Sequence, residues 1–316
     1  MSNKKIIAVV GATGAQGGGL ARAILADKSG EFALRAITRD VASPAARALA
    51  AAGADVVAAD ASDAASVARA FSGAYGAYCV TFFWNTMSPE KEREEARNLA
   101  TAAKQARLEY VVWSTLEDSR RWVKLDDPRM PTLRGNYKVP HFDVKGEADA
   151  FFKDSGVPTT CLLTSFYWDN LIHFGMGPKP GPDGRLVFAL PMGQRKLPGI
   201  AAEDIGRCAY GLIRRGSEFA GRTVGIAGEH LTGAEMAAGL AQALGREVVH
   251  QDVPFDVYRG LGFPGADDLG NMFQFNHDFS ADFCKARSVE FSRSLNPALQ
   301  GFSGWATANA AKIPVT

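Results

Sequence analysis

Three glycines near the amino end have the spacing of a loop that binds a diphosphate. Gly11, Gly14 and Gly17 form the pattern GxxGxxG directly after the apolar run at residues 6–10 and before a helical stretch. In such a loop the first glycine permits a tight turn, the second lets backbone amides approach the ligand, and the third lets helix and strand pack closely. The helix amino end adds free N–H groups and a partial positive charge. We therefore predict a dinucleotide site, and a tight turn without a ligand is the alternative.

The residues that end the second expected strand indicate which dinucleotide fits. A carboxylate there accepts a hydrogen bond from the ribose 2′-hydroxyl of NAD, whereas a cation there binds the 2′-phosphate of NADP. Thr38 and Arg39 offer a hydroxyl and a guanidinium with two parallel donors, and Asp40 follows them. We predict NADP(H) as the cofactor, with NAD(H) as the less favoured one and a solvated surface arginine as the structural alternative. Asp60 and Ala61, after the third strand, are expected to border the adenine.

A lysine interrupts the buried face of a helix that the pattern predicts from residue 139 to before Gly156. That face carries His, Val, Lys, Ala and Phe at positions 141, 144, 145, 148 and 152. The ammonium of Lys145 suits a ribose hydroxyl or a phosphate, unless the side chain extends to the surface instead. His141 is equally explained as a buried histidine with its hydrogen bonds satisfied. Tyr137 and Lys138 add a phenol and a cation on the loop side.

Hydroxyl and aromatic residues follow several of the expected strands. Ser114 and Thr115 end the fifth strand, at the carboxyl edge where open α/β folds bind ligands, although strand ends elsewhere carry hydroxyls too. Residues 81–85 (TFFWN) and 164–168 (TSFYW) place aromatic rings after two other strands. Such rings can flank a flat ligand ring, or they can fill the core of a domain interface.

The order of the elements predicts a doubly wound α/β fold. Short apolar runs alternate with helical stretches in the first half of the chain, at residues 6–10, 33–38, 56–59, 77–82 and 110–114. Right-handed βαβ crossovers wind such strands into a parallel Rossmann sheet whose faces are both covered. We predict an NAD(P)-binding Rossmann domain over residues 1–163, rejoined by about 195–227, and a smaller α/β substrate or partner domain over 164–316.

The second half of the chain is less regular. Residues 175–184 are mostly glycine and proline, so we expect an irregular loop there. Thr232 and Glu235 have the spacing of a capping box, which predicts that a helix begins there, and Gly245 is expected to end it.

Composition and charge exclude several classes of protein. The chain has 316 residues, of which 47% are hydrophobic and 22% charged, an ordinary globular balance. Its 35 Lys and Arg against 34 Asp and Glu leave a net charge of +1, so we expect no direct nucleic-acid partner. No signal-peptide core and no apolar run of ~20 residues is present, which predicts a soluble, cytoplasmic protein without a membrane partner. The four cysteines lie far apart, so no metal site is expected.

These motifs together resemble the NmrA-like family, an atypical branch of the short-chain dehydrogenase/reductases. The segments GATGAQGG, TRD, VTFFW, VVWSTLED, VPHFDVKGEADAFF and GFPGADDLGNMFQF fall in family order over nearly the whole chain. The resemblance implies a Rossmann domain, a smaller α/β domain and a bound NAD(P), which many members prefer in its phosphorylated form.

The resemblance also implies a part of the nucleotide for each segment. The diphosphate is expected to bind six residues of the glycine loop: Gly11, Thr13, Gly14, Ala15, Gln16 and Gly17. Arg39 would bind the 2′-phosphate, and Asp60 and Ala61 would flank the adenine. The central ribose would be lined by Thr81, Phe82 and Phe83, and the nicotinamide ribose would be bound by Lys145. The nicotinamide would be bordered by Thr164, Ser165, Phe166 and Tyr167.

One position departs from the wider superfamily. Catalytic members use Tyr-x-x-x-Lys, in which the lysine lowers the phenol pKa so that the tyrosine can transfer a proton to a carbonyl oxygen. Here the same spacing holds His141 and Lys145. The NmrA-like branch commonly has this replacement, and some members act as cofactor-sensing regulators. Isoflavone reductase-like enzymes, in contrast, reduce aromatic substrates with the lysine and without that tyrosine.

Two functions agree with these residues. The first is an NADP(H)-dependent oxidoreductase that reduces a quinone-like or polycyclic aromatic carbonyl compound by hydride transfer. Lys145, with His141 or Tyr137, would stabilise or protonate the oxyanion, and Ser114 completes the candidate catalytic residues. The second is a non-catalytic NADP(H)-sensing redox regulator that acts through protein partners. We expect a small aromatic substrate or a regulatory protein as the partner, and a monomer or homodimer.

Overall fold

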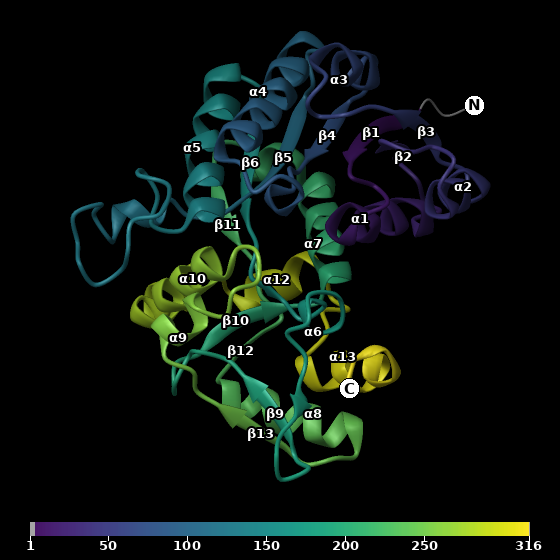
Figure 1. Ribbon diagram of the computed structural model, residues 1–316. Coiled ribbons are helices and arrows are strands. Elements are labelled where there is room, and N and C mark those ends of the chain that lie inside the picture. The colour runs from purple at the N-terminus through teal and green to yellow at the C-terminus, as the bar shows by residue number, and fades with distance from the viewer. Residues whose placement is uncertain (1–3, 316) are drawn as a thin grey trace. The chain divides into compact units, whose positions relative to one another are not determined.

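The computed structural model describes residues 4–315 and divides them into two compact units (Figure 1). The first unit contains the chain up to Asp118, together with Val144–Leu163 and Glu203–Val224. The second contains Ser119–Asp143, Thr164–Ala202 and the chain from Gly225 onward. Residues 119–143 thus belong to the second unit, although the boundary predicted from the sequence lay at residue 163. Side chains of a later helix hold the backbone of these residues, as described below.

A seven-stranded sheet forms the centre of the first unit, in the order β11-β6-β5-β4-β1-β2-β3. Its strands are β1 (Lys5–Val10), β2 (Phe32–Thr38), β3 (Asp55–Ala58), β4 (Gly76–Cys79), β5 (Tyr110–Thr115), β6 (Thr159–Leu163) and β11 (Thr223–Gly225). The pairings among β1 to β6 are parallel. Because β1 lies between β2 and β4, the strand order reverses beside it, which makes the carboxyl end of β1 the topological switch point. The predicted doubly wound fold is confirmed.

Six helices accompany this sheet. They are α1 (Ala15–Ala26), α2 (Pro44–Ala51), α3 (Ala64–Phe71), α4 (Pro89–Gln105), α5 (Pro140–Ser155), which enters the unit at Val144, and α7 (Ala202–Arg215). Side chains of α3, α4 and α5 share one buried apolar core with the strands, in which the rings of Trp113 and Phe152 stack at 4.5 Å. Ser43, Asp63 and Ser88 accept hydrogen bonds from the first turns of α2, α3 and α4, as N-cap residues do.

Helices α1 and α7 approach each other through glycines. A Cβ atom on Gly19 would lie 2.5 Å from the carbonyl oxygen of Glu203, and one on Gly206 would overlap the backbone nitrogen of Leu20. Arg22 adds an ion pair across the same contact, its Nε lying 3.0 Å from a carboxylate oxygen of Glu203. The glycines of α1 therefore serve helix packing as well as the turn that precedes the helix, and this packing fixes the amino end of α1.

The second unit contains two small sheets and several short helices. One sheet has the order β12-β10-β7 and the other β13-β9-β8. Their strands are β7 (Phe166–Tyr167), β8 (Lys179–Pro180), β9 (Leu186–Ala189), β10 (Leu197–Ile200), β12 (Glu229–Leu231) and β13 (Val248–Gln251). The helices are α6 (Asn170–His173), α8 (Gly233–Leu244), α9 (Phe255–Arg259), α10 (Ala266–Asp278), α11 (Ser280–Lys285), α12 (Val289–Leu295) and α13 (Phe302–Asn309).

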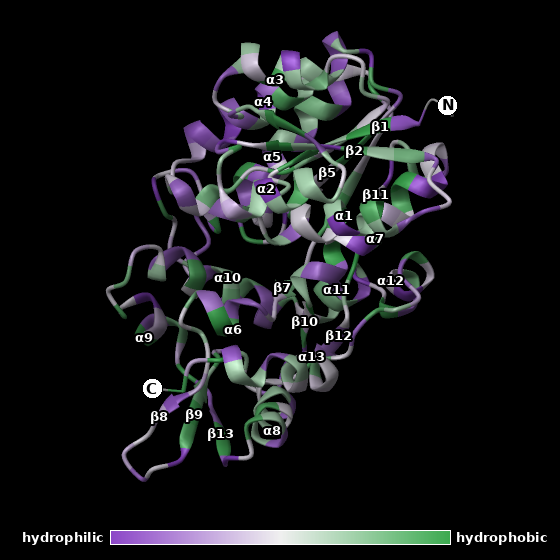
Figure 2. Ribbon diagram, turned by 90° about the vertical axis from the view of Figure 1, so that its right-hand side faces the viewer, coloured by the Kyte–Doolittle hydropathy of each residue, from purple (hydrophilic) through white to green (hydrophobic). Residues whose placement is uncertain are grey.

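Local signals in this unit give two results. The capping box of Thr232 and Glu235 begins α8, and Gly245 ends it with a left-handed φ of 61°, as predicted. The glycine- and proline-rich segment 175–184 is less irregular than expected, because Lys179–Pro180 pairs antiparallel with β9. Figure 2 shows β9 as a hydrophobic segment, and its Leu186 and Phe188 are fully buried. Within residues 4–315, no helix combines the length and apolar composition needed to cross a bilayer.

The α1–α7 contact predicts that the substitution Gly206→Ala destabilises the protein. The added methyl group would overlap the backbone of α1, and overpacking of this kind costs about 1–3 kcal/mol of unfolding free energy. Gly304→Ala is the matched control, because a Cβ there meets nothing within 4 Å and alanine favours a helix by ~1 kcal/mol. Thermal denaturation of both variants measures the effect. Equal melting temperatures for the two would contradict the contact.

Candidate functional site

The glycine loop joins the end of β1 to the start of α1 in a shape that only glycine permits. Gly11 has a φ of +64°, and the N–H of Gly14 donates to its carbonyl oxygen at 2.8 Å. A Cβ atom on Gly17 would overlap that same carbonyl group. Gly14 caps α1 without a side chain, so it offers no oxygen to the N–H groups of the first turn. Those groups and the dipole of a 12-residue helix are suited to an anion.

Two hydroxyl groups hold the side chain of Gln16, a residue at the end of this loop. Its Oε1 accepts hydrogen bonds from the hydroxyl of Tyr78 and from that of Ser114, the latter at 2.8 Å. Ser114 is only 2% exposed. The structure therefore brings two of the predicted residues together, and it gives Ser114 the geometry of a residue that positions Gln16. A catalytic part for Ser114 stays a prediction.

The ends of β2 and β3 bring the expected adenine and 2′-phosphate residues to one edge. Thr38 and Ala58 are register partners there, and Arg39 is exposed just beyond them. The hydroxyl of Ser62 donates to Asp60 at 2.7 Å, and this hydrogen bond is the main cause that lowers the pKa of the Asp60 carboxyl. The charge of Arg39 lowers that pKa further, so the two side chains are near enough to interact. The guanidinium remains accessible to a ligand.

Lys145 directs its ammonium toward the end of β4. Its Nζ lies 2.8 Å from the hydroxyl oxygen of Thr81, 3.0 Å from the Thr81 carbonyl oxygen and 2.7 Å from a carboxylate oxygen of Glu92. The side chain is 11% exposed, so the surface alternative is not what the structure shows. The ammonium also lies 5.5 Å from the centre of the Trp113 ring. Because β4 neighbours β1 in the sheet, this cation lies in the region of the switch point.

Glu92, the counter-charge of Lys145, was not predicted from the sequence. Its side chain is 2% exposed and accepts a hydrogen bond of 2.5 Å from the hydroxyl of Thr81. It lies in a run of mixed charges, EKEREEAR, which looks like a solvated helix face. The signal that could have revealed it is its helical spacing with the buried residues Ala96 and Leu99.

The two phenylalanines after β4 differ in exposure. β4 ends at Cys79, earlier than the expected end at residue 82, so Thr81 and Phe82 lie in the following loop. Phe82 is 50% exposed, whereas Phe83 is buried and packs edge-on against Trp84. Phe82 is therefore the phenylalanine ring that this loop offers to a ligand.

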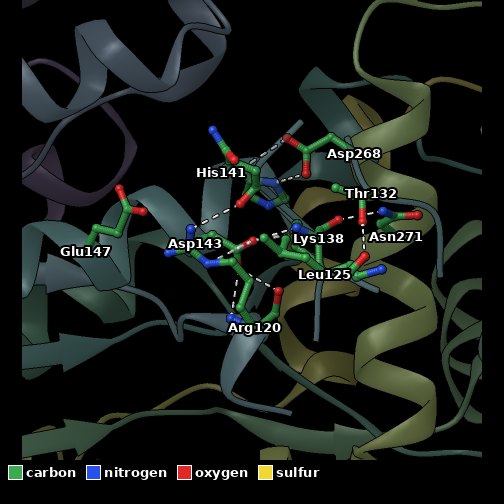
Figure 3. A network of polar contacts seen from close by, with 12 residues as sticks. Arg120, Leu125, Thr132, Lys138, His141, Asp143, Glu147, Asp268 and Asn271 are labelled. Carbon is green, nitrogen blue, oxygen red and sulfur yellow. Dashed lines mark hydrogen bonds and ion pairs between the residues drawn. The ribbon is translucent and has the colours of Figure 1, made fainter. Parts of the chain in front are cut away.

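In the second unit, His141 forms a buried pair with Asp268, an acid in the first turn of α10 (Figure 3). The Nδ1 atom of His141 lies 2.6 Å from one oxygen of Asp268, and its backbone N–H donates to the other at 3.2 Å. The two side chains are 7% and 1% exposed. The structure thus shows a buried, hydrogen-bonded histidine, which was the alternative interpretation. Asp268 was not predicted, because 127 residues separate it from His141.

The residues before His141 are also buried in the second unit. The ammonium of Lys138 donates to the carbonyl oxygens of Met130 and Asp127, at 2.6 and 2.9 Å, and burial lowers its pKa. Asn271 of α10 donates to the carbonyl oxygen of Lys138, which ties the loop to the helix (Figure 3). Tyr137 is 6% exposed, with the Arg120 guanidinium 5.3 Å from the centre of its ring. Lys138 is therefore a structural cation of this loop.

The segment expected to border the nicotinamide lies in the second unit as well. The carbonyl oxygen of Thr164 accepts from Arg287 at 2.7 Å, and the hydroxyl of Ser165 donates to the carbonyl of Ile226. Phe166 is 8% exposed, whereas Tyr167 is half-buried. Their assignment to the nicotinamide stays a prediction. Within residues 4–315, no group of three His, Cys, Asp or Glu side chains has the arrangement of a metal site.

A second acid of α4 makes the stability of the protein depend on pH. Burial, followed by the charges of Glu92 and Asp60, raises the pKa of Glu95 from 4.5 to about 7. Since the unfolded chain releases this proton at lower pH, ionisation of Glu95 destabilises the fold as the pH rises toward neutrality. We expect Glu95→Gln to raise the melting temperature most at about pH 8 and least at about pH 5. Glu94→Gln, at an exposed neighbour, is the control, and equal pH profiles for the two variants would contradict the raised pKa of Glu95.

Several known proteins are similar to this chain in sequence or in fold. An NmrA-like family domain-containing oxidoreductase of Aspergillus flavus, lnbB, is 27% identical over 291 residues, which cover 87% of this chain and 84% of that protein. The solved structure of NmrA with NADP, described as a negative transcriptional regulator, has a TM-score of 0.78 at 21% identity over 96% of this chain and 94% of that one. NmrA has also been solved with NAD.

A third similar protein is the NADPH-dependent quinone oxidoreductase QOR2 of Escherichia coli, solved with NADPH. It has a TM-score of 0.68 at 21% identity over 96% of this chain and 99% of that one. At such identities the solved structures establish the shared fold. The sequence profile of the NmrA-like family matches residues 3–305, nearly the whole sequence. This chain therefore belongs to the NmrA-like family.

Proposed function

We propose that this protein binds NADP(H) at the glycine loop and uses it to reduce a quinone-like or polycyclic aromatic carbonyl compound. The observation that carries the proposal is the buried ammonium of Lys145, 2.7 Å from Glu92, in the region of the switch point of the sheet. Open α/β folds bind their ligands at such a point. A cation kept there by a buried partner is available to hydroxyl groups and to a developing negative charge.

The residues of the first unit fit a dinucleotide phosphate. The first-turn amides of α1 would hold the diphosphate, because Gly14 leaves them uncapped and Gly17 lets the loop approach the helix closely. The exposed guanidinium of Arg39 would bind the 2′-phosphate through two parallel hydrogen bonds. When bound, the nucleotide supplies the hydride. The protein binds and orients it and places a hydrogen-bond donor beside the reacting oxygen.

Lys145 is the residue we propose to act on the reacting groups. Its ammonium would donate to a ribose hydroxyl and would stabilise the oxyanion that forms when hydride reaches a carbonyl carbon. Phe82, half exposed in the loop that follows β4, would pack against a flat ligand. His141 has a buried carboxylate on its Nδ1, an arrangement that fixes the orientation of an imidazole. A role of His141 in proton transfer stays a prediction.

The comparisons support an oxidoreductase but leave an alternative. The relative lnbB is described as an oxidoreductase, and QOR2 as an NADPH-dependent quinone oxidoreductase. NmrA, in contrast, is described as a transcriptional regulator. A non-catalytic NADP(H) sensor is therefore the second candidate, and the replacement of the superfamily tyrosine by His141 is the observation that favours it. Turnover of a quinone separates the two.

The nucleotide preference is tested at Arg39. Arg39→Gln removes the guanidinium proposed to bind the 2′-phosphate, so we expect affinity for NADPH to fall by roughly 10- to 100-fold, the value of a charge-assisted hydrogen bond or two. Affinity for NADH should change little. Titration calorimetry measures both, and Arg47→Gln, at another exposed arginine of this unit, is the control. An unchanged ratio of the two affinities would contradict the assignment of Arg39.

The proposed reaction is tested at Lys145. We expect the wild-type protein to oxidise NADPH in the presence of at least one neutral quinone, and Lys145→Met to lower kcat by about 100-fold or more, since electrostatic stabilisation of an oxyanion is worth that much. Lys153→Met, exposed near the end of the same helix, is the control. Lys145→Met alone leaves a buried carboxylate unpaired, which can destabilise the protein. The double variant K145M/E92Q removes both charges, so a loss of kcat in it is due to the missing ammonium and not to unfolding.

Two results would contradict the proposal in different ways. Absence of turnover by the wild-type protein over a panel of quinones and polycyclic ketones would refute the reductase. If Lys145→Met changed the affinity for NADPH and left kcat as it is, the lysine would serve only to bind the nucleotide. Partner proteins that bind the chain with and without NADPH at different affinities would then support the sensor.

A further inference from the structure

Glu92, the counter-charge of Lys145, affects which ligands the ammonium can bind. Glu92 is almost fully buried, and the two charged groups lie 2.7 Å apart, so they form a pair without net charge. An isolated ammonium attracts anions, such as carboxylates, sulfonates and phosphates, more strongly than neutral oxygens. A paired one keeps its hydrogen-bond donors, which still stabilise an oxyanion held at hydrogen-bond distance, but its partner offsets most of its attraction for charged groups elsewhere on a substrate. The pair therefore changes what this position selects.

The hydrogen bonds around the ammonium have a fixed direction. A lysine has three N–H donors, and three acceptors surround Lys145: the Thr81 carbonyl oxygen, the Thr81 hydroxyl oxygen and a carboxylate oxygen of Glu92. The Thr81 hydroxyl gives its own hydrogen to Glu92 at 2.5 Å, so it offers only lone pairs to the lysine. A ligand oxygen at this ammonium has to share or replace one of these acceptors. It therefore comes close to the buried carboxylate.

The surroundings on α4 favour neutral ligands further. Glu95 lies on the same helix, and burial together with the charges of Glu92 and Asp60 raises its pKa to about 7. The opposing attraction of Lys91 and Lys145 does not cancel this shift. The charges of Glu92 and Asp60 contribute to this shift after burial, and an anionic ligand group near these acids would meet repulsion from the same charges.

We propose that Glu92 is a specificity-determining residue, which makes the Lys145 position accept neutral hydroxyl and carbonyl oxygens and discriminate against substrates that carry a carboxylate or sulfonate. The inference rests on the proposed function, in which Lys145 faces the reacting carbonyl group. It adds the chemical class of the substrate, an uncharged quinone or ketone. A clash with the buried carboxylate is the repulsive element on which such specificity depends.

The test compares naphthoquinone with naphthoquinone sulfonate as substrates of the full chain with NADPH. The measured quantity is the ratio of kcat/KM for the neutral quinone to kcat/KM for the sulfonate. We expect Glu92→Gln to lower this ratio by about tenfold, the effect of removing one nearby like charge. Glu92→Asp keeps the charge and should keep the preference, and Glu94→Gln, exposed on the same helix, is the matched control. A Glu92→Gln protein that loses activity on both quinones equally would overturn the inference and give Glu92 a structural role.

A second measurement covers the case in which Glu92→Gln does not fold. K145M/E92Q removes both charges, so neither buried side chain is left without its partner. Calorimetry on the NADP complex of this double variant should show that the preference for the neutral quinone over the sulfonate, present in the wild-type protein, is lost. A double variant that keeps the wild-type preference overturns the inference.

Failure of the proposed function gives a different result. If the wild-type protein reduces neither quinone, the reductase is refuted, and specificity is then measured as binding of the two quinones to the NADP complex by calorimetry. A preference for the neutral quinone that Glu92→Gln removes would support the inference without turnover. Equal preferences in both proteins would overturn it.

Discussion

The ion pair between Lys145 and Glu92 is the interaction on which the rest of the first unit depends. A charge buried without a partner costs several kcal/mol, so each side chain is stabilised at its buried position by the other. The pair joins α5 to α4, and Thr81 adds the end of β4 to it. These helices share one apolar core with the sheet, and the packing of that core sets the spacing that the pair needs. The packing of the core therefore determines the position of the ammonium proposed to act on the substrate.

A second constraint fixes the amino end of α1, where we propose that the diphosphate binds. The helix cannot shift along the sheet, because Gly17 lies against the carbonyl group of Gly11 and Gly19 against the backbone of α7. Such close contacts leave no room for a Cβ atom, which explains why the run after the turn is so rich in glycine. The helix that would hold an anion is therefore held in place from both sides.

The sequence predicted best the features that are local. The glycine turn, the alternation of strands and helices and the buried position of Lys145 all follow from spacing along the chain, because each depends on residues that are close in the sequence. Hydrogen-bond and charge partners that only tertiary packing brings together could not be predicted in the same way. Glu92 lies in a run of mixed charges that resembles a solvated helix face. Asp268 and His141, like Ser114 and Gln16, are partners that lie far apart in the sequence. Periodicity shows which face is buried but not what that face meets.

Both proposed functions require that the turn after β1 binds the diphosphate of NADP(H). A calorimetric titration of the purified full chain with NADPH, NADP, NADH and NAD measures this binding. We expect saturable binding to one site per chain, tighter for the two phosphorylated nucleotides than for the other two. No binding of any of the four nucleotides at millimolar concentration would contradict it, and both the reductase and the sensor would then be wrong.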